Sequence, residues 1–330
     1  MHAAMHAALL VAGLAVGSGL AAASAVQDAP QHPRPIRELI ATLNAADPAA
    51  RAKAACELKR QGDRAAEAIP ALIATLGDAS PVNSAVCRER WSSGRDGETT
   101  PGELAAAALA GIGTAAVQPL IAALENPVWV ARRNAVWALG ALDDPRGVAP
   151  VTNALRDREP GVREQAAWAV GAMDADSAVQ ALIAALADPG DRVRRQAAWS
   201  LGAIGAEAAA SPLGAVLKDP SEDVRRQAAW ALGAIGAETA VQPLAAALKD
   251  SSAGVRKQAA WALGAIGRSG GVEGLIDALR DASREVREQA AWALGAIGDP
   301  RAMQGLAAAM KDSEPGVRRQ AAWALGVISR

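Results

Sequence analysis

Seven tryptophans recur at a fixed interval of 31 residues, and this spacing constrains the fold more than any other feature of the chain. The series is Trp137, Trp168, Trp199, Trp230, Trp261, Trp292 and Trp323. Self-similarity at a constant period of this length indicates an array of stacked units, in which each unit contacts mainly its neighbours. The chain has 330 residues, with nine Trp and no Phe or Tyr, so this series supplies most of its aromatic side chains.

Each unit contains two stretches with the apolar spacing of a helix. The first stretch is like AVQPLAAALKD (residues 240–250), and the second is like VRRQAAWALGAIG (residues 224–236). A turn such as DPSED (residues 219–223) joins them, and Asp and Gly near the boundaries supply helix caps. The sequence therefore predicts a two-helix repeat.

The phase of the second helix separates a buried stripe from a polar face. At about 100° per residue, one stripe is predicted to hold Val224, Ala228, Ala231, Leu232 and Ile235. Trp230 falls on the opposite side, among polar residues such as Arg226 and Gln227. A large aromatic ring on the polar face needs its own explanation.

The same register predicts about nine units. Residues 35–113 form two degenerate units, in which Cys56 and Ala107 take the tryptophan position, and residues 114–330 form seven regular units. The second degenerate unit carries an insertion at about 79–101. Degenerate units are typical of the ends of such arrays.

The first 25 residues contain no Asp, Glu, Lys or Arg, and they pass from an Ala/Leu/Val stretch into small residues that end at Ala25. This pattern predicts a secretory signal peptide, followed by a polar linker over residues 26–34. The alternative is an uncleaved membrane anchor, although the stretch is rich in Ala and Gly. Cleavage would place the mature chain outside the cytoplasm, in a periplasm, with no stable membrane insertion.

Export makes Cys56 and Cys87 candidates for a disulfide, because oxidising compartments preserve such bonds. A closed loop of about 31 residues would stabilise the fold by about 3–4 kcal/mol. The bond would also attach the insertion to the first unit. The alternative is two unrelated thiols.

The repeat resembles HEAT-like repeat proteins, particularly the short-unit type found in phycobilisome lyases and bacterial scaffolds. This resemblance implies an all-α, right-handed α-solenoid whose second helices line the concave surface. It also implies that an Asp in each inter-helix turn and an Arg six residues later bridge neighbouring units. The matching residues include Asp188, Arg194, Asp219, Arg225, Asp250 and Arg256. At Arg132 the corresponding turn residue is Asn126, so a weaker bridge is expected there.

Three rows of side chains are predicted on the concave surface. Trp occupies the central row, and an amide row flanks it, including Gln196, Gln227 and Gln258. The other flank is mostly basic, including Arg195, Arg226 and Lys257. Trp and amide side chains on an inner groove resemble the peptide-binding surface of armadillo proteins. The rows are therefore candidates for binding a protein or peptide segment.

Two alternatives remain for the tryptophan row. Each ring can pack across the neighbouring unit, or it can contact a partner, and the two roles are compatible. The resemblance to lyases implies a further candidate function, which is a lyase-like or chaperone-like accessory or regulatory module of an envelope enzyme. Self-association through the C-terminal repeat is a further expectation.

Catalysis and nucleic-acid binding find little support in the sequence. His32, in the predicted linker, is the sole His after the predicted signal peptide, so neither a Ser-His-Asp triad nor a multi-His metal site can be assembled within the repeats. We therefore expect no catalytic residue, no metal site and no cofactor. The net charge is only −1, and Glu164 and Glu288 interrupt the basic row, whereas nucleic-acid binding needs a basic stripe.

Overall fold

The computed structural model describes residues 34–87 and 97–329, which belong to one compact unit. The predicted signal peptide and residues 26–33 of the predicted linker lie outside the described residues. Within them, eighteen α-helices form nine consecutive pairs. The prediction of an all-α solenoid built from two-helix repeats is confirmed.

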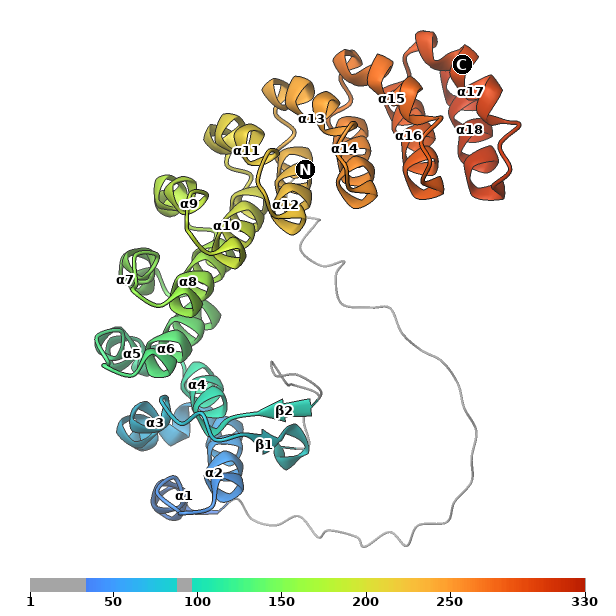
Figure 1. The fold of residues 1–330 in the computed structure, drawn as a ribbon. Helices are drawn as coiled ribbons and strands as arrows, with labels where there is room; N and C mark the ends of the chain where they lie inside the picture. The colour runs from blue at the N-terminus through green and yellow to red at the C-terminus, as the bar shows by residue number, and fades with distance from the viewer. Residues whose placement is uncertain (1–33, 88–96, 330) are drawn as a thin grey trace, which may run out of the picture. The chain divides into compact units, whose positions relative to one another are not determined.

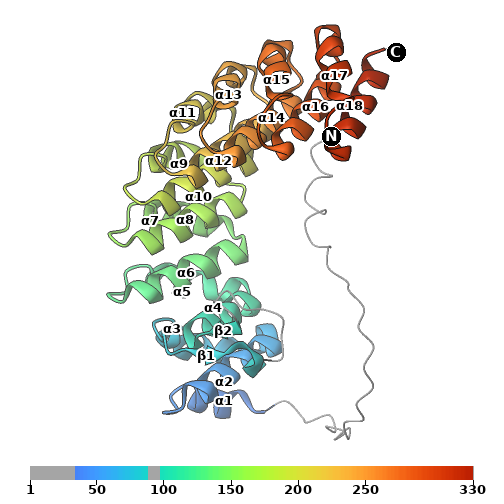
Figure 2. The same cartoon turned by 45° about the vertical axis from the view of Figure 1, so that its right-hand side comes forward.

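The helices form two layers (Figure 1). The second helix of each pair lies on the inner side of the curve, and the first helix lies on the outer side. Figure 2 shows the same two layers after a 45° turn. The second helices are α2 (Pro48–Gln61), α4 (Pro101–Ile112), α6 (Trp129–Leu142), α8 (Pro160–Ala172), α10 (Asp191–Ile204), α12 (Glu222–Ile235), α14 (Ala253–Ile266), α16 (Arg284–Ile297) and α18 (Pro315–Ile328).

The first helices are short, and most of them follow a turn of 3₁₀ helix. They are α1 (Ile36–Thr42), α3 (Ile69–Thr75), α5 (Val117–Ala123), α7 (Pro145–Ala154), α9 (Val179–Ala185), α11 (Ala210–Val216), α13 (Val241–Ala247), α15 (Val272–Ala278) and α17 (Met303–Ala309). The 3₁₀ segments are η1 (Gly62–Ala68), η4 (Thr114–Ala116), η5 (Asp176–Ala178), η6 (Glu207–Ala209), η7 (Glu238–Ala240), η8 (Ser269–Gly271) and η9 (Pro300–Ala302).

Local sequence explains where the second helices end. Gly205, Gly236 and Gly267 adopt left-handed φ angles of 74°, 74° and 69° directly after their helices. Gly adopts this conformation without a steric cost, so it ends a helix and lets the chain turn into the next unit. Asp143 and Asp174 take left-handed φ angles of 51° and 48° at the corresponding ends of α6 and α8.

The core runs along the whole array between the layers. Val224, Ala228, Ala231 and Leu232 are fully buried, as the phase of the helix predicts, whereas Ile235 is half-buried. Ala229 is also fully buried, so the apolar stripe is wider than predicted. The reason is that each second helix packs against the second helices before and after it as well as against its own first helix.

The predicted insertion contains a small two-stranded antiparallel sheet. Strand β1 (Val82–Asn83) pairs with β2 (Glu98–Thr99), with Val82 opposite Thr99. The 3₁₀ segment η2 (Ser84–Cys87) follows β1 and packs against α2. The sheet lies on the inner side of the curve, beside α2 and α4 (Figure 1).

Candidate functional site

The predicted tryptophans occupy equivalent positions on seven second helices that pack side by side, from α6 to α18. The first six rings, from Trp137 to Trp292, are half-buried. Trp323 in α18 is 44% exposed. No unit follows α18 within residues 34–329, so one side of its ring is uncovered.

Several of the rings fit into notches, and each notch is left by a glycine of the preceding second helix. A Cβ atom on Gly233 would lie 2.7 Å from Cζ3 of Trp261 and 2.8 Å from Cα of Ala262. The corresponding distance from Gly264 to Cζ3 of Trp292 is 2.7 Å. The six-membered ring therefore packs between two helices, which is the packing role left open by the sequence.

The indole nitrogens of the row reach the surface without a hydrogen-bond partner. Across the described residues, no side-chain or backbone oxygen accepts a hydrogen bond from the indoles of Trp168, Trp199, Trp230, Trp261, Trp292 or Trp323. No buried side-chain nitrogen or oxygen in this part of the chain lacks a partner, so these nitrogens must be accessible. The rings of Trp230, Trp261 and Trp292 thus bury their six-membered edges and leave their N–H groups accessible.

The amide row behaves in the same way. Gln165, Gln196, Gln227, Gln258, Gln289 and Gln320 are half-buried, and among residues 34–87 and 97–329 none has a hydrogen-bonding partner for its amide. In contrast, Asn134 is buried at the corresponding position of α6 and donates to the carbonyl oxygen of Leu76 at 2.9 Å. The amides that are free to bind a partner therefore begin at α8, with Gln165.

The basic flank is largely neutralised by neighbouring carboxylates. Arg195 lies 3.7 Å from Glu164 of the preceding unit, and Arg226 lies 2.7 Å from Asp223 of its own helix. In the described segments, no carboxylate lies within 4 Å of the amino group of Lys257. The predicted rows lie together on one face, but this flank offers little net charge to a partner.

Trp129 joins the surface near its N-terminal end, and the 31-residue pattern does not reveal it. It is the first residue of α6, it is 40% exposed, and the guanidinium of Arg133 lies 5.5 Å from the centre of its ring. A Cβ atom on Gly161 would lie 3.3 Å from this ring. With Trp137 and Trp168 it lines a shallow hollow of about 620 Å³.

The Arg and Asp residues that were predicted to bridge units form a regular ladder. Arg194 donates to both carboxylate oxygens of Asp219 in the next unit, at 2.7 and 2.9 Å. Its remaining terminal nitrogen donates to the carbonyl oxygens of Asp188 and Pro189, at 2.9 and 3.1 Å. Arg225 and Asp250 repeat this arrangement at 2.7 and 3.0 Å. Each Arg therefore ties its own turn to the following turn.

The expectation of a weaker bridge at Arg132 was wrong. Arg132 donates to both oxygens of Asp157 at 2.7 and 2.8 Å, because the Arg pairs with the Asp of the next unit rather than with its own turn residue. From its own turn it needs only the backbone carbonyl of Asn126, which any residue supplies. The sequence also missed a bridge between Arg51 and Asp78, at 2.6 Å, in the degenerate units.

The ladder changes the acidity of its carboxyl groups. Burial alone would raise the pKa of Asp250, but hydrogen bonds from Arg225 and from the backbone N–H of Ser252 outweigh burial, so the pKa is lowered. For Asp281 the hydrogen bond from Arg256 is the largest cause of its lowered pKa. These carboxylates stay ionised and paired at neutral pH.

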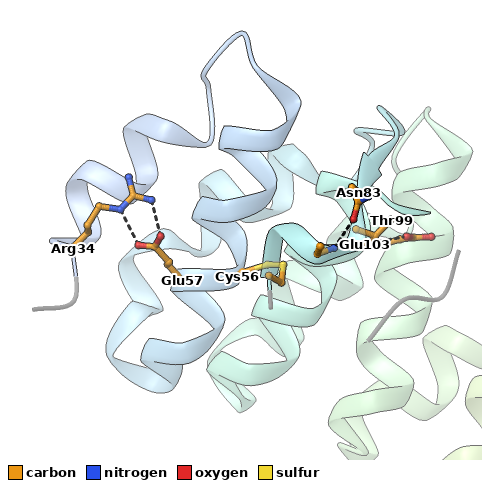
Figure 3. The surroundings of a disulfide bond; sticks show 8 residues. Arg34, Cys56, Glu57, Asn83, Thr99 and Glu103 are labelled. Atoms are coloured by element: carbon orange, nitrogen blue, oxygen red, sulfur yellow. Dashed lines mark hydrogen bonds and ion pairs between the residues drawn. A yellow bond between two sulfur atoms is a disulfide. The ribbon is translucent and has the colours of Figure 1, made fainter. Parts of the chain in front are cut away.

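A disulfide joins Cys56 of α2 to Cys87 at the end of η2, with Cα atoms 5.8 Å apart (Figure 3). The predicted pairing is therefore present, and it holds the insertion against the tryptophan position of the first unit. Glu103 of α4 accepts a hydrogen bond from Thr99 of β2 at 3.1 Å and pairs with Arg133 at 3.3 Å. The insertion is thus connected to the end of the row.

The described segments contain no group of three His, Cys, Asp or Glu residues that could hold a metal ion. No helix in this part of the chain is by itself long and apolar enough to cross a membrane, although the bent pair Pro101–Ile112 and Thr114–Ala123 meets that criterion when its two helices are combined.

Comparison with known families decides the classification. The pattern of HEAT repeats matches residues 103–159, 148–220, 210–273 and 272–329. The chain belongs to the HEAT-repeat family. These matches cover most of the chain, and HEAT solenoids generally act as protein-interaction scaffolds and are typically non-catalytic. Among curated proteins no match was found.

Solved structures support the HEAT fold. An engineered protein shares 22% identity with a TM-score of 0.53, and the match covers 89% of each chain. Kap95p, solved in a study of its binding to RanGDP, shares 15% identity with a TM-score of 0.63 over 89% of this chain and 46% of its own. Importin beta shares 16% identity with a TM-score of 0.60 over 89% and 45%. At these identities the likeness shows the fold alone.

Proposed function

We propose that this HEAT solenoid is a non-enzymatic scaffold that binds a peptide or protein segment on its inner tryptophan and glutamine rows. The observation that carries this proposal is that unused polar groups lie side by side along both rows. Six indole N–H groups and six Gln amides reach the surface without a protein partner. Such groups are free to bind the backbone of a segment laid along the array.

The half-buried rings also favour a binding role. Trp supplies a large and rigid contact area together with one N–H donor, and it is enriched among the residues that dominate binding energy in interfaces. Here the ring is held in place by the glycine notch of the preceding helix, as Gly233 holds Trp261. The donors are therefore positioned before a partner arrives, which lowers the entropic cost of binding.

A flat ligand stacked along the row fits the geometry less well. The six-membered edges of Trp261 and Trp292 are held against the preceding helices, so only part of each ring is available for stacking. The lyase-like or chaperone-like alternative therefore has support only from the resemblance on which it was based. The disulfide is consistent with an oxidising compartment, and we propose that the protein is exported to the periplasm.

The experiment is a pull-down from host envelope extract with glutamine variants, because the inner glutamines make no internal hydrogen bonds and their loss leaves the fold intact. The inner triple variant is Gln196→Ala, Gln227→Ala and Gln258→Ala. A matched control replaces three exposed glutamines of the outer helices, Gln118→Ala, Gln180→Ala and Gln242→Ala.

We expect a partner that the wild-type protein and the outer variant both retain and the inner variant loses. Circular dichroism should show the same helicity for all three proteins. Equal retention by all three would place the binding site away from these rows and would refute the proposal.

A further inference from the structure

We infer that the segment bound on the inner rows is a proline-rich chain in the polyproline II conformation. This inference rests on the proposed function, and it adds the conformation and the composition of the partner. Three features of the rows support it: the spacing of the helices, the kind of hydrogen-bonding groups offered, and the shape and charge of the surface.

The spacing expected of packed helices is close to one turn of polyproline II. Packed helices lie about 8–10 Å apart, and the contact of Gly233 with Ala262 places this pair close. One three-residue turn of polyproline II advances about 9.3 Å and returns the same face to the array. A β-strand returns the same face every two residues, after about 6.6–6.8 Å, so it would lose register over successive units.

The donor row suits a backbone that offers only acceptors. Indole N–H groups donate and cannot accept, and one such donor projects from each second helix from α8 to α18, as from Trp199, Trp230 and Trp261. Proline has a carbonyl acceptor but no backbone N–H, and the carbonyl groups of polyproline II make no internal hydrogen bonds. The Gln amides add further donors beside each indole.

Small apolar side chains lie exposed beside the tryptophans. Four residues after each Trp from Trp137 to Trp292, on the same face of the helix, lies an exposed alanine, and Val327 takes this place after Trp323. Those alanines include Ala203, Ala234, Ala265 and Ala296. A Trp edge beside a bare alanine leaves room for a pyrrolidine ring, and aromatic-lined grooves are the surfaces on which proline-rich helices dock.

The charge of the flank also favours an uncharged segment. Arg195 and Arg226 each lie within 4 Å of a carboxylate of this chain, so an acidic segment would have to displace these carboxylates. An uncharged, proline-rich segment can bind without displacing these carboxylates. It is also already extended before binding, which reduces the ordering cost.

The test uses a phage library of random twelve-residue peptides selected on the wild-type protein. A second protein carries Trp230→Phe, Trp261→Phe and Trp292→Phe, which keep an aromatic ring in the glycine notch but remove three indole N–H groups. Circular dichroism and thermal unfolding establish that this variant is folded. Selected peptides are then synthesised and titrated against both proteins by calorimetry.

We expect peptides enriched in proline, with preferred residues recurring every third position, and binding at least about tenfold weaker to the Phe variant. Tryptophan-dependent peptides without proline enrichment, or with a two-residue period, would overturn this inference and leave the proposed function standing. If no peptide distinguishes the wild-type protein from the Phe variant, the inference is overturned in that case too. The glutamine variants then decide the proposed function separately.

Discussion

Replacing Gly233 by Ala tests whether the tryptophan row depends on close approach of the second helices. Gly233 lies inside α12, where Ala is favoured over Gly by about 1 kcal/mol from helix propensity alone. Its new methyl group would meet Cζ3 of Trp261 at 2.7 Å and Cα and Cβ of Ala262 at 2.8 Å. The Ala262 atoms are backbone or attached directly to it, so α14 itself has to move.

The balance of the two effects gives the expected magnitude. Overpacking of a tight contact costs about 1–3 kcal/mol, and contacts with backbone belong at the upper end of that range. After subtraction of the gain in helix propensity, Gly233→Ala should destabilise the α12–α14 interface by about 1–2 kcal/mol. The change should also push the ring of Trp261 toward solvent.

Gly326 provides a matched control in the same sequence context, Ala-Leu-Gly. No atom lies within 4 Å of a Cβ atom built on it, so Gly326→Ala keeps only the gain in helix propensity. We expect it to stabilise α18 by about 0.5–1 kcal/mol.

Amide hydrogen exchange is the suitable assay, because stability in repeat arrays is approximately a sum of unit and nearest-neighbour terms. Gly233→Ala should lower protection in α12 and α14 and shift tryptophan emission to longer wavelength. Gly326→Ala should raise protection in α18. If Gly233→Ala raises protection as much as Gly326→Ala does, the notch is not tight and the reasoning fails.

Three further changes test other parts of the array. Asp174→Gly should stabilise the protein by about 1 kcal/mol in thermal unfolding, because it relieves a left-handed non-glycine residue and removes a carboxylate near the C-terminal end of α8; an unchanged or lower melting temperature would contradict this. Asp250→Asn should destabilise by about 1–3 kcal/mol at pH 7 in urea unfolding, because it removes the charged partner of the half-buried Arg225 guanidinium. The folded state lowers the pKa of Asp250, so this carboxylate stabilises the protein above its unfolded pKa of about 3.9 and ceases to do so as the pH falls through its folded pKa. The difference between variant and wild type should therefore shrink below about pH 4, and a constant difference would argue against the ion pair. Replacing Cys56 and Cys87 together by Ser should cost about 3–4 kcal/mol, with loss of protection confined to α2 and the insertion; loss spread over the whole array would show that the disulfide does more than attach the insertion.

The sequence predicts the fold because the fold is a local pattern repeated. Helix length, caps and the buried stripe around Leu232 are properties of one unit, and each can be worked out from one copy. The pairing of Cys56 with Cys87 was one of two alternatives suggested by two cysteines in a chain with a predicted signal peptide. The helix features do not require knowledge of how two units meet, whereas the disulfide joins the first unit to the insertion of the second.

The features that the sequence could not predict depend on contacts between units. A helical phase calculation treats one helix alone, so it places Trp261 on the polar face and cannot show that Gly233 of the preceding helix receives its ring. The partner of Arg132 was misjudged for the same reason, because the receiving Asp157 lies in the next unit. Trp129 was missed because it stands outside the 31-residue series.

The same contact explains why one residue serves both packing and the proposed binding. The six-membered ring of Trp261 fixes α14 to α12, and this leaves its N–H group at a set position on the surface. Any change in helix separation therefore moves the donors along the row as well. The spacing of the donors is set by the packing of Gly against Ala, as between Gly233 and Ala262, so a partner that recognises the row recognises the helix spacing of the solenoid.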